Sequence, residues 1–119
     1  MNPRASTFEA VRSLSVDQLR AFAATEPQAL LLDVREPWEV QLARIELPGM
    51  AMLHIPMNDI PERLDELDVS QPVVCICHHG VRSAQVVAFL QQSGLPRVYN
   101  LAGGLEAWST QIDPTMPRY

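Results

Sequence analysis

The sequence contains no lysine. All nine of its basic residues are arginine, and 14 acidic residues leave the chain with a formal net charge of −5. An acidic surface without lysine argues against nucleic acid or an anionic membrane as a partner. The same absence excludes catalysis through a Schiff base, because that chemistry needs a lysine amine.

Cysteine is scarce as well, with only Cys75 and Cys77, two positions apart. A disulfide between such close neighbours would be strained, so we expect two free thiols and a reducing compartment. Two histidines, His78 and His79, follow the cysteines. Residues this close in sequence rarely converge on a tetrahedral metal ion. We therefore expect no metal and no other cofactor.

Long apolar runs are missing too. No segment approaches the length that spans a membrane, and the first dozen residues lack the apolar core of a signal peptide. We expect a soluble, cytoplasmic protein. A chain of 119 residues is long enough for one hydrophobic core. Residues 1–12 are predicted to form a flexible lead-in, and residues 13–119 to form the single domain.

The apolar residues predict strands that alternate with helices. Continuous apolar runs at residues 30–34 and 73–77 are typical of strands covered on both faces of a parallel sheet. Ser15 and Gln18 have the spacing of a capping box at a helix start. The other predicted elements are strands over 54–57 and 97–101, helices over 60–67 and 83–93, and a last short helix that follows Gly103-Gly104 and runs through Trp108. This alternation predicts a parallel α/β fold, in which ligands bind at the carboxyl ends of the strands.

The second apolar run ends in a loop with the sequence Cys77-His78-His79-Gly80-Val81-Arg82-Ser83. Gly80 supplies the backbone freedom that a tight turn needs. The amides of such a loop point inward, as does the start of the following helix, for which Ser83 is the predicted N-cap. This arrangement favours a thiolate on Cys77. Arg82 adds a positive charge and a planar fork suited to an oxyanion.

Three segments of the chain resemble motifs of one protein family. Cys77-x-x-Gly80-x-Arg82-Ser83 is similar to the active-site loop of rhodanese-like sulfurtransferases. Asp33-Val34-Arg35-Glu36 and Tyr99-Asn100-Leu101-Ala102-Gly103-Gly104-Leu105-Glu106-Ala107-Trp108 resemble two further segments of that family. The resemblance covers residues 14–108. Residues 112–119 are similar to the tails of rhodanese domains fused to enzymes that activate sulfur-carrier proteins.

The resemblance implies a rhodanese-like fold, with a central parallel sheet of about five strands flanked by helices on both faces. It also implies a sulfurtransferase that works in two steps through a persulfide on Cys77. A small-molecule donor such as thiosulfate would give its outer sulfur to the thiolate, and a thiol or cyanide acceptor would then remove it. The residues expected to bind the donor are Arg82, His78, His79, Gly80, Val81 and Ser83, with Arg35 a further candidate for the pocket wall.

Several of these residues have structural interpretations beside the functional one. Arg82 could bond loop carbonyls as well as the substrate anion, and His78 and His79 could set specificity or be solvated. Asp33 and Arg35 are interpreted first as scaffold. The residues expected to be purely structural are Cys75, a core thiol with a minor alternative as resolving cysteine, together with His54, Trp38 and Trp108.

Other functions remain open at this point. Cysteine-based phosphatases and arsenate reductases use a similar loop with five residues between Cys and Arg, whereas four lie between Cys77 and Arg82. The shorter loop favours a sulfur atom over a phosphoryl group. An inactive module that only binds a partner would be expected to lack the nucleophile. A persulfide carrier that serves a sulfur-relay protein would use the same chemistry, and the sequence does not separate it from a small-molecule enzyme.

Overall fold

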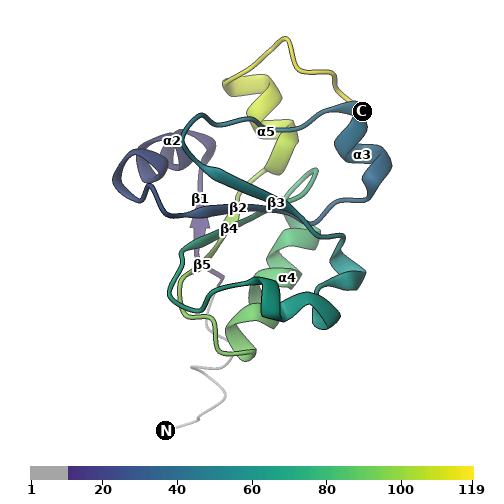
Figure 1. Ribbon diagram of the computed structural model, residues 1–119. Coiled ribbons are helices and arrows are strands. Elements are labelled where there is room, and N and C mark those ends of the chain that lie inside the picture. Colours follow the sequence, from purple (N-terminus) through teal and green to yellow (C-terminus); the bar gives the residue numbers. More distant parts are fainter. Residues whose placement is uncertain (1–10) are drawn as a thin grey trace, which may run out of the picture.

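The computed structural model describes residues 11–119, which form a five-stranded parallel sheet between two layers of helices (Figure 1). The strand order is β1-β5-β4-β2-β3. The strands are β1 (Ser13–Leu14), β2 (Leu30–Asp33), β3 (Ala51–His54), β4 (Val73–Ile76) and β5 (Val98–Leu101). The predicted parallel α/β architecture is confirmed.

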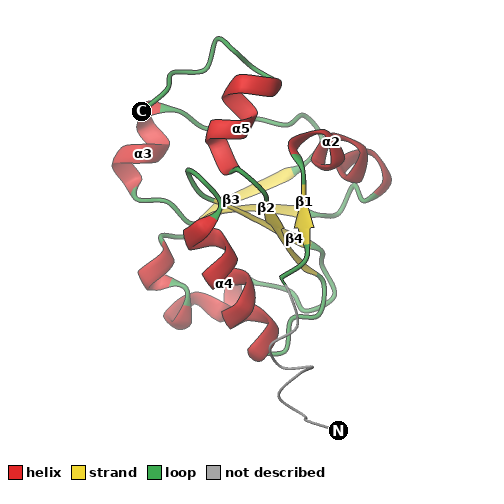
Figure 2. Cartoon of the chain, turned by 180° about the vertical axis from the view of Figure 1, so that it is seen from behind, coloured by secondary structure: helices red, strands yellow, loops and turns green. Residues whose placement is uncertain are grey.

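The helices divide between the two faces of the sheet. They are α2 (Val16–Thr25), α3 (Pro37–Leu42), α4 (Val81–Gln92) and α5 (Gly104–Gln111), with two 3₁₀ helices, η1 (Met57–Asp59) and η2 (Pro61–Glu66). Seen from behind, α2 and α5 lie on one side of the sheet and α4 on the other (Figure 2). This is the three-layer arrangement that parallel strands require, because both of their faces must be covered.

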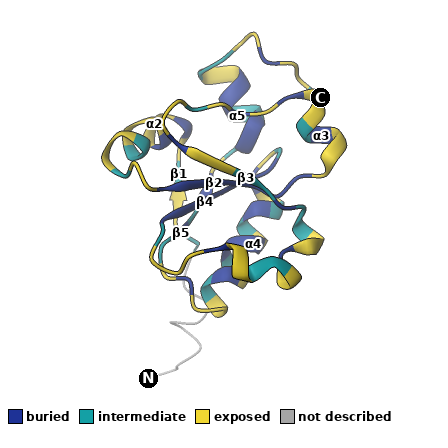
Figure 3. Ribbon diagram, viewed as in Figure 1, coloured by how far each residue is buried: buried dark blue, intermediate teal, exposed yellow. Residues whose placement is uncertain are grey.

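Both faces of the central strands are buried, as their continuous apolar runs predicted (Figure 3). Successive side chains of a strand point to opposite faces. Leu32 and Cys75 accordingly belong to the apolar cluster that includes residues of α4, and Leu31 and Val74 to the cluster that includes residues of α2 and α5. The two clusters together form the core.

The capping box predicted at the first helix is confirmed. The Ser15 hydroxyl oxygen accepts a hydrogen bond from the Gln18 amide at 3.1 Å, and the Gln18 side-chain oxygen accepts one from the Ser15 amide at 2.8 Å. Val16 and Leu19 are buried against the sheet. The two reciprocal bonds therefore fix the start of α2 where its apolar face begins.

The strand predicted over residues 54–57 is displaced in the structure. It is β3, which pairs with β2 from Leu30 opposite Ala51 to Asp33 opposite His54. Pro56 has no N–H group and cannot continue the ladder, so the strand ends before it. Ile55 and Pro56 belong to the following loop, and Met57 begins η1.

The α-helix predicted over residues 60–67 is also wrong. The segment forms 3₁₀ turns, in which amides bond three residues back, as from Leu67 to Leu64 at 3.0 Å. Arg63, with φ of −117°, interrupts the helix. Ile60 and Leu67 are nevertheless buried, so the spacing predicted the apolar face but not the type of helix.

The N-terminal part of the domain adds the first strand. The predicted lead-in, residues 1–12, lies outside the described residues except for positions 11 and 12. Strand β1, which was not predicted, pairs in parallel with β5, with Ser13 opposite Asn100 and Leu14 opposite Leu101. Among residues 11–119, no helix is long and apolar enough to cross a membrane.

The sheet order places the candidate loop between two other strand ends. Strand β4 lies between β2 and β5, and all three run in the same direction. The segments that follow these strands therefore meet at one edge of the sheet, where parallel α/β proteins bind their ligands. They begin at Val34, Cys77 and Ala102.

Replacing Ser15 with alanine should lower the free energy of unfolding by about 1 kcal/mol, because the amide of Gln18 loses its partner at the start of α2. Chemical denaturation measures the change. Ser15→Thr keeps the hydroxyl and is the control. Equal stability of the alanine variant and the unaltered protein would contradict the role of this cap.

Candidate active site

Cys77 lies immediately after β4, and its sulfur faces backbone donors. The Gly80 N–H donates to the Cys77 Sγ at 3.1 Å, and the Ser83 N–H donates to it at 3.3 Å. Gly80 has φ of +97°, a left-handed conformation that favours glycine and turns the chain back toward the sulfur. The predicted cradle of inward-facing amides is present at these two positions. Such donors stabilise negative charge on sulfur.

The Cys77 side chain is 1% exposed. It belongs to the apolar cluster of the α4 side of the sheet, and its sulfur meets the amides of Gly80 and Ser83 and the Ser83 hydroxyl oxygen. Of the neighbouring loop residues, His79 and Val81 are exposed and His78 is half-buried. The sulfur therefore sits at the base of the loop, with the loop itself at the surface.

Ser83 was predicted to be the N-cap of the following helix, and this prediction is wrong. Helix α4 begins at Val81 with Gly80 as its cap, so Ser83 lies in the first turn and is buried. Its hydroxyl oxygen is 3.2 Å from the Cys77 Sγ, and the hydroxyl donates to the Asn100 side chain. Asn100 also donates to the Gly80 carbonyl at 3.0 Å. The serine thus contacts the sulfur directly and links it to β5.

Helix α5 holds the other side of the loop. The amides of Leu105 and Glu106 donate to the carbonyls of Cys77 and His78, each at 3.0 Å. This approach depends on Gly104, since a Cβ atom there would overlap the Cys77 carbonyl oxygen and lie 2.6 Å from that of His78. The first amides of α5, which have no acceptor within their own helix, therefore hold the loop in place.

Arg82 forms a bidentate ion pair with Glu39 of α3. Its Nη1 lies 2.6 Å from Glu39 Oε1 and its Nη2 lies 2.8 Å from Oε2. The fork that was expected to bind a substrate anion is therefore engaged by a carboxylate of the protein. Glu39 is only 3% exposed, and hydrogen bonding from Arg82 is the main reason that its pKa falls to about 2.

Arg35 belongs to the scaffold, as its first interpretation held. It is fully buried, and its guanidinium donates to the Asp33 carboxylate, the Glu39 and Ala43 carbonyls and the Tyr119 hydroxyl. Each of its five N–H groups has an acceptor in this set. No donor of Arg35 is left for a substrate, which argues against its candidacy for the pocket wall.

Tyr119 covers the outer side of the loop. Its ring stacks on His78 with centroids 4.0 Å apart, and His78 in turn stacks on His79 at the same separation. Its hydroxyl donates to Glu39 at 2.9 Å and accepts from Arg35 at 2.7 Å. Burial, with a smaller effect of neighbouring His79, lowers the pKa of His78. His78 is thus favoured in its neutral form.

One group of side chains at the rim has donor atoms suited to a cation. The ligand atoms of His78, His79 and Glu106 lie within 4.8 Å of one another. Glu106 also pairs with Arg118. This set differs from the cysteine–histidine cluster considered from the sequence, because it draws its carboxylate from α5 and uses neither thiol.

Three of the residues that were expected to be structural have the surroundings of structural residues. Burial raises the pKa of the fully buried Cys75 thiol, Trp108 packs in the core, and His54 Nε2 lies 2.7 Å from the Arg35 carbonyl. Trp38 is the exception. It is 59% exposed and packs edge-on against the Tyr119 ring, with centroids 5.9 Å apart, so it lies at the surface and not in the core.

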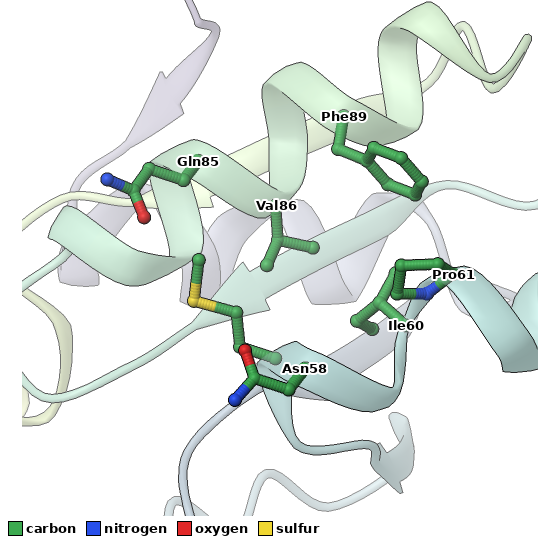
Figure 4. A pocket seen from close by; sticks show the side chains of 7 residues that line it. Asn58, Ile60, Pro61, Gln85, Val86 and Phe89 are labelled. Carbon is green, nitrogen blue, oxygen red and sulfur yellow. The ribbon is translucent and has the colours of Figure 1, made fainter.

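A separate pocket of about 250 Å³ lies between the η1–η2 segment and α4. Figure 4 shows Phe89 and Val86 of α4 on one side of it, and Ile60 and Pro61 on the other. Its remaining lining residues are Met57, Asn58 and Gln85. None of these seven residues belongs to the 77–83 loop, so the pocket is distinct from the cysteine site.

Three residues of the site were missed from the sequence: Glu39, Asn100 and Tyr119. Asn100 carries a usable signal, because a polar residue in an otherwise apolar strand needs a partner when it is buried. Glu39 lies 43 positions from Arg82 and 80 positions from Tyr119. No local pattern connects residues so far apart.

The geometry agrees with what comparison with known proteins shows. The model of the rhodanese-like domain matches residues 15–111, which include β2 to β5 and the whole 77–83 loop. The chain belongs to the rhodanese-like family. The resemblance inferred from the three sequence motifs is thereby confirmed.

Rhodanese-like relatives of this chain include proteins named as sulfurtransferases. One from Allochromatium vinosum is 37% identical to this chain, and the alignment covers 83% of this chain and 89% of that protein. The thiosulfate sulfurtransferase GlpE of Vibrio cholerae is 32% identical over 80% of this chain and 87% of its own. This chain spans only 39% of the rhodanese-like/PpiC domain-containing protein 12 of Arabidopsis thaliana, to which it is 34% identical.

Solved structures share the rhodanese-like fold. A rhodanese-like domain protein from Staphylococcus aureus, 31% identical, matches with a TM-score of 0.71 over 82% of this chain and 91% of that protein. The reduced CoADR-RHD protein of Bacillus anthracis, 25% identical, matches with a TM-score of 0.76 over 92% of this chain, which corresponds to 18% of that protein.

Replacing Gly104 with alanine should displace the rhodanese-like loop, because the new Cβ would overlap the Cys77 carbonyl. We expect a loss of at least about 2 kcal/mol in unfolding free energy. We also expect faster alkylation of Cys77 by a neutral thiol reagent. Gly94→Ala is the matched control, since Gly94 also has a positive φ but no atom within 4 Å of an added Cβ. Similar alkylation rates in both variants would contradict the role of Gly104.

The Glu39 ion pair should make stability depend on pH. The folded pKa of about 2 lies below the usual 4.5, so the pair stabilises the fold above pH 4.5 and this contribution is lost as the pH falls toward 2. Compared with Glu39→Gln, the unaltered protein should lose about 3 kcal/mol of relative stability across that window.

Denaturant titrations from pH 7 to pH 2 measure this difference. Glu26→Gln, which removes a carboxylate from a more exposed ion pair with Arg97, shows how much any lost charge contributes. A difference between the unaltered protein and Glu39→Gln that stays constant down to pH 2 would contradict the assignment.

Proposed function

We propose that this chain is a sulfurtransferase that carries a sulfane sulfur as a persulfide on Cys77. The observation that supports it is the Cys77 sulfur at the end of β4, with the amides of Gly80 and Ser83 directed at it. The relatives named as sulfurtransferases support the same class of reaction. We place the reaction in the cytoplasm, because a reducing compartment keeps both thiols free.

In the first step, the Cys77 thiolate attacks the outer sulfur of a donor such as thiosulfate. A new S–S bond forms, the bond between the two donor sulfurs breaks, and sulfite leaves with the bonding pair. In the second step, cyanide or a thiolate attacks the terminal sulfur and Cys77 leaves as the thiolate. Neither step requires a general base when the thiol is already ionised.

The loop supplies the stabilisation that both steps need. The terminal sulfur of a persulfide carries negative charge, and the donors that the loop directs toward Cys77 are the backbone N–H groups of Gly80 and Ser83. Backbone donors at a helix start stabilise such charge without a mobile side chain. We therefore assign donor and persulfide binding to the loop residues His78, His79, Gly80, Val81 and Ser83.

A second candidate is a persulfide carrier that exchanges sulfur with a partner protein. Val81 of the loop is 67% exposed, and Trp38 is exposed beside Tyr119, which stacks on His78. Exposed apolar side chains next to a reactive group are suited to contact with another protein. The chemistry at Cys77 would be the same, with a protein persulfide as the donor.

Intact-mass measurement tests the persulfide directly. After incubation with thiosulfate and removal of the donor, the protein should gain the mass of one sulfur atom and lose it on reduction. Cys77→Ser should gain none, because a hydroxyl cannot form a persulfide. Cys75→Ala is the matched control and should load like the unaltered protein. Loading of the Cys77→Ser variant would refute the proposal.

A further inference from the structure

Among residues 11–119, the arginines around the 77–83 loop are all paired with carboxylates. Arg82 pairs with Glu39, and buried Arg35 pairs with Asp33. Arg118 pairs with Glu106, whose other oxygen lies 3.8 Å from His78 Nε2. No lysine is available anywhere in the sequence. A donor that approaches Cys77 therefore meets dipoles of the loop but no uncompensated cation among these side chains.

Glu39 cannot easily release Arg82 to a substrate. Its Oε1 accepts from Arg82 and from the Glu36 amide at 3.0 Å, and its Oε2 accepts from Arg82 and from the Tyr119 hydroxyl. A buried carboxylate that loses its cation is strongly destabilised. Arg82 therefore remains paired with Glu39 when no substrate is bound. The pair as a whole has a net charge near zero, so it attracts an anionic donor only weakly.

We propose that Glu39 is a positioning residue that sets the class of sulfur donor, by neutralising Arg82 so that donors with one negative charge are favoured over dianions such as thiosulfate. This inference rests on the proposed persulfide chemistry at Cys77. Favoured donors are thiosulfonates and persulfides whose transferring end carries a single charge. Thiosulfate is a substrate, but a poor one.

Two small donors isolate the effect of charge. In methanethiosulfonate a methyl group replaces one anionic oxygen of thiosulfate, so the donor is a monoanion. With either donor the Cys77 thiolate bonds to the outer sulfur while the bond between the two donor sulfurs breaks. Sulfite leaves from thiosulfate and methanesulfinate leaves from methanethiosulfonate, each with the bonding pair. The Cys77 persulfide anion is the product of both reactions.

The measured quantity is the selectivity ratio, kcat/KM for thiosulfate divided by kcat/KM for methanethiosulfonate, with cyanide as acceptor and thiocyanate as the detected product. Glu39→Gln leaves the positive charge of Arg82 unopposed. The dianion then gains one more unit of attraction than the monoanion, and the ratio should rise about tenfold. Glu26→Gln, at the opposite edge of the sheet beside Arg97, should leave the ratio unchanged. General damage to the fold would not improve the use of thiosulfate.

Two more variants complete the test and serve even where Glu39→Gln fails to fold. Arg82→Gln leaves the charge of Glu39 uncompensated, so the ratio should fall about tenfold. Combining it with Glu39→Gln removes both charges and allows an amide–amide hydrogen bond, so the ratio should return to that of the unaltered protein. A double variant whose ratio stays as low as that of Arg82→Gln would show that Arg82 contacts the donor itself, and would overturn the inference.

Failure of this inference is distinguishable from failure of the proposed function. Persulfide formation with both donors, together with an unchanged ratio in Glu39→Gln, overturns the role of Glu39 and leaves the sulfurtransferase proposal standing. The absence of a Cys77 persulfide with both donors in the unaltered protein overturns both.

Discussion

The contact between the Cys77 sulfur and the amides of Gly80 and Ser83 is the interaction on which the site depends. It requires a chain that reverses direction immediately after a buried strand, which the left-handed conformation of Gly80 provides. It also requires that the loop not relax, and the Leu105 and Glu106 amides of α5 secure it. The donors are backbone groups, so most substitutions in the loop would change its rim and leave these donors in place.

Glu39 has a comparable importance for the surroundings of the loop. One buried carboxylate joins α3, the first turn of α4 and the segment after α5, through Arg82 and Tyr119. Arg35, in the segment after β2, extends this network to the last residue of that strand, Asp33. Compared with apolar side chains of similar volume, a buried ion pair adds little net stability, but it enforces one geometry because each alternative leaves a charge unpaired. The wall of the site is therefore set by electrostatics as much as by packing.

The sequence predicted the parts of this structure that depend on local pattern. The apolar runs predicted β2 and β4, and the spacing of Ser15 and Gln18 predicted the start of α2. The position of Cys77 at a strand end predicted its loop. Predictions failed where one sequence feature is compatible with two different structural roles. The hydroxyl of Ser83 suits either an N-cap or a partner for sulfur, and only the observed start of α4 at Val81 decides between them.

Contacts between distant residues could not be predicted at all. The fork of Arg82 suits a substrate anion and a carboxylate of the protein equally well. Its actual partner, Glu39, lies on a different helix 43 positions away. The motif therefore predicted the loop around Cys77, whereas the partner that a tertiary contact brings to Arg82 was not predicted.

The position of Cys75 has a consequence for the lifetime of bound sulfur. It lies within β4, two residues before Cys77 and in the same apolar cluster, and the sequence has no third cysteine. Cys75 is fully buried, and burial raises the pKa of its thiol, which disfavours the thiolate that would have to attack the persulfide and form a disulfide. Under the proposed chemistry, unloading is strictly bimolecular, so the protein would retain its cargo for as long as acceptors are dilute and would empty in proportion to their concentration.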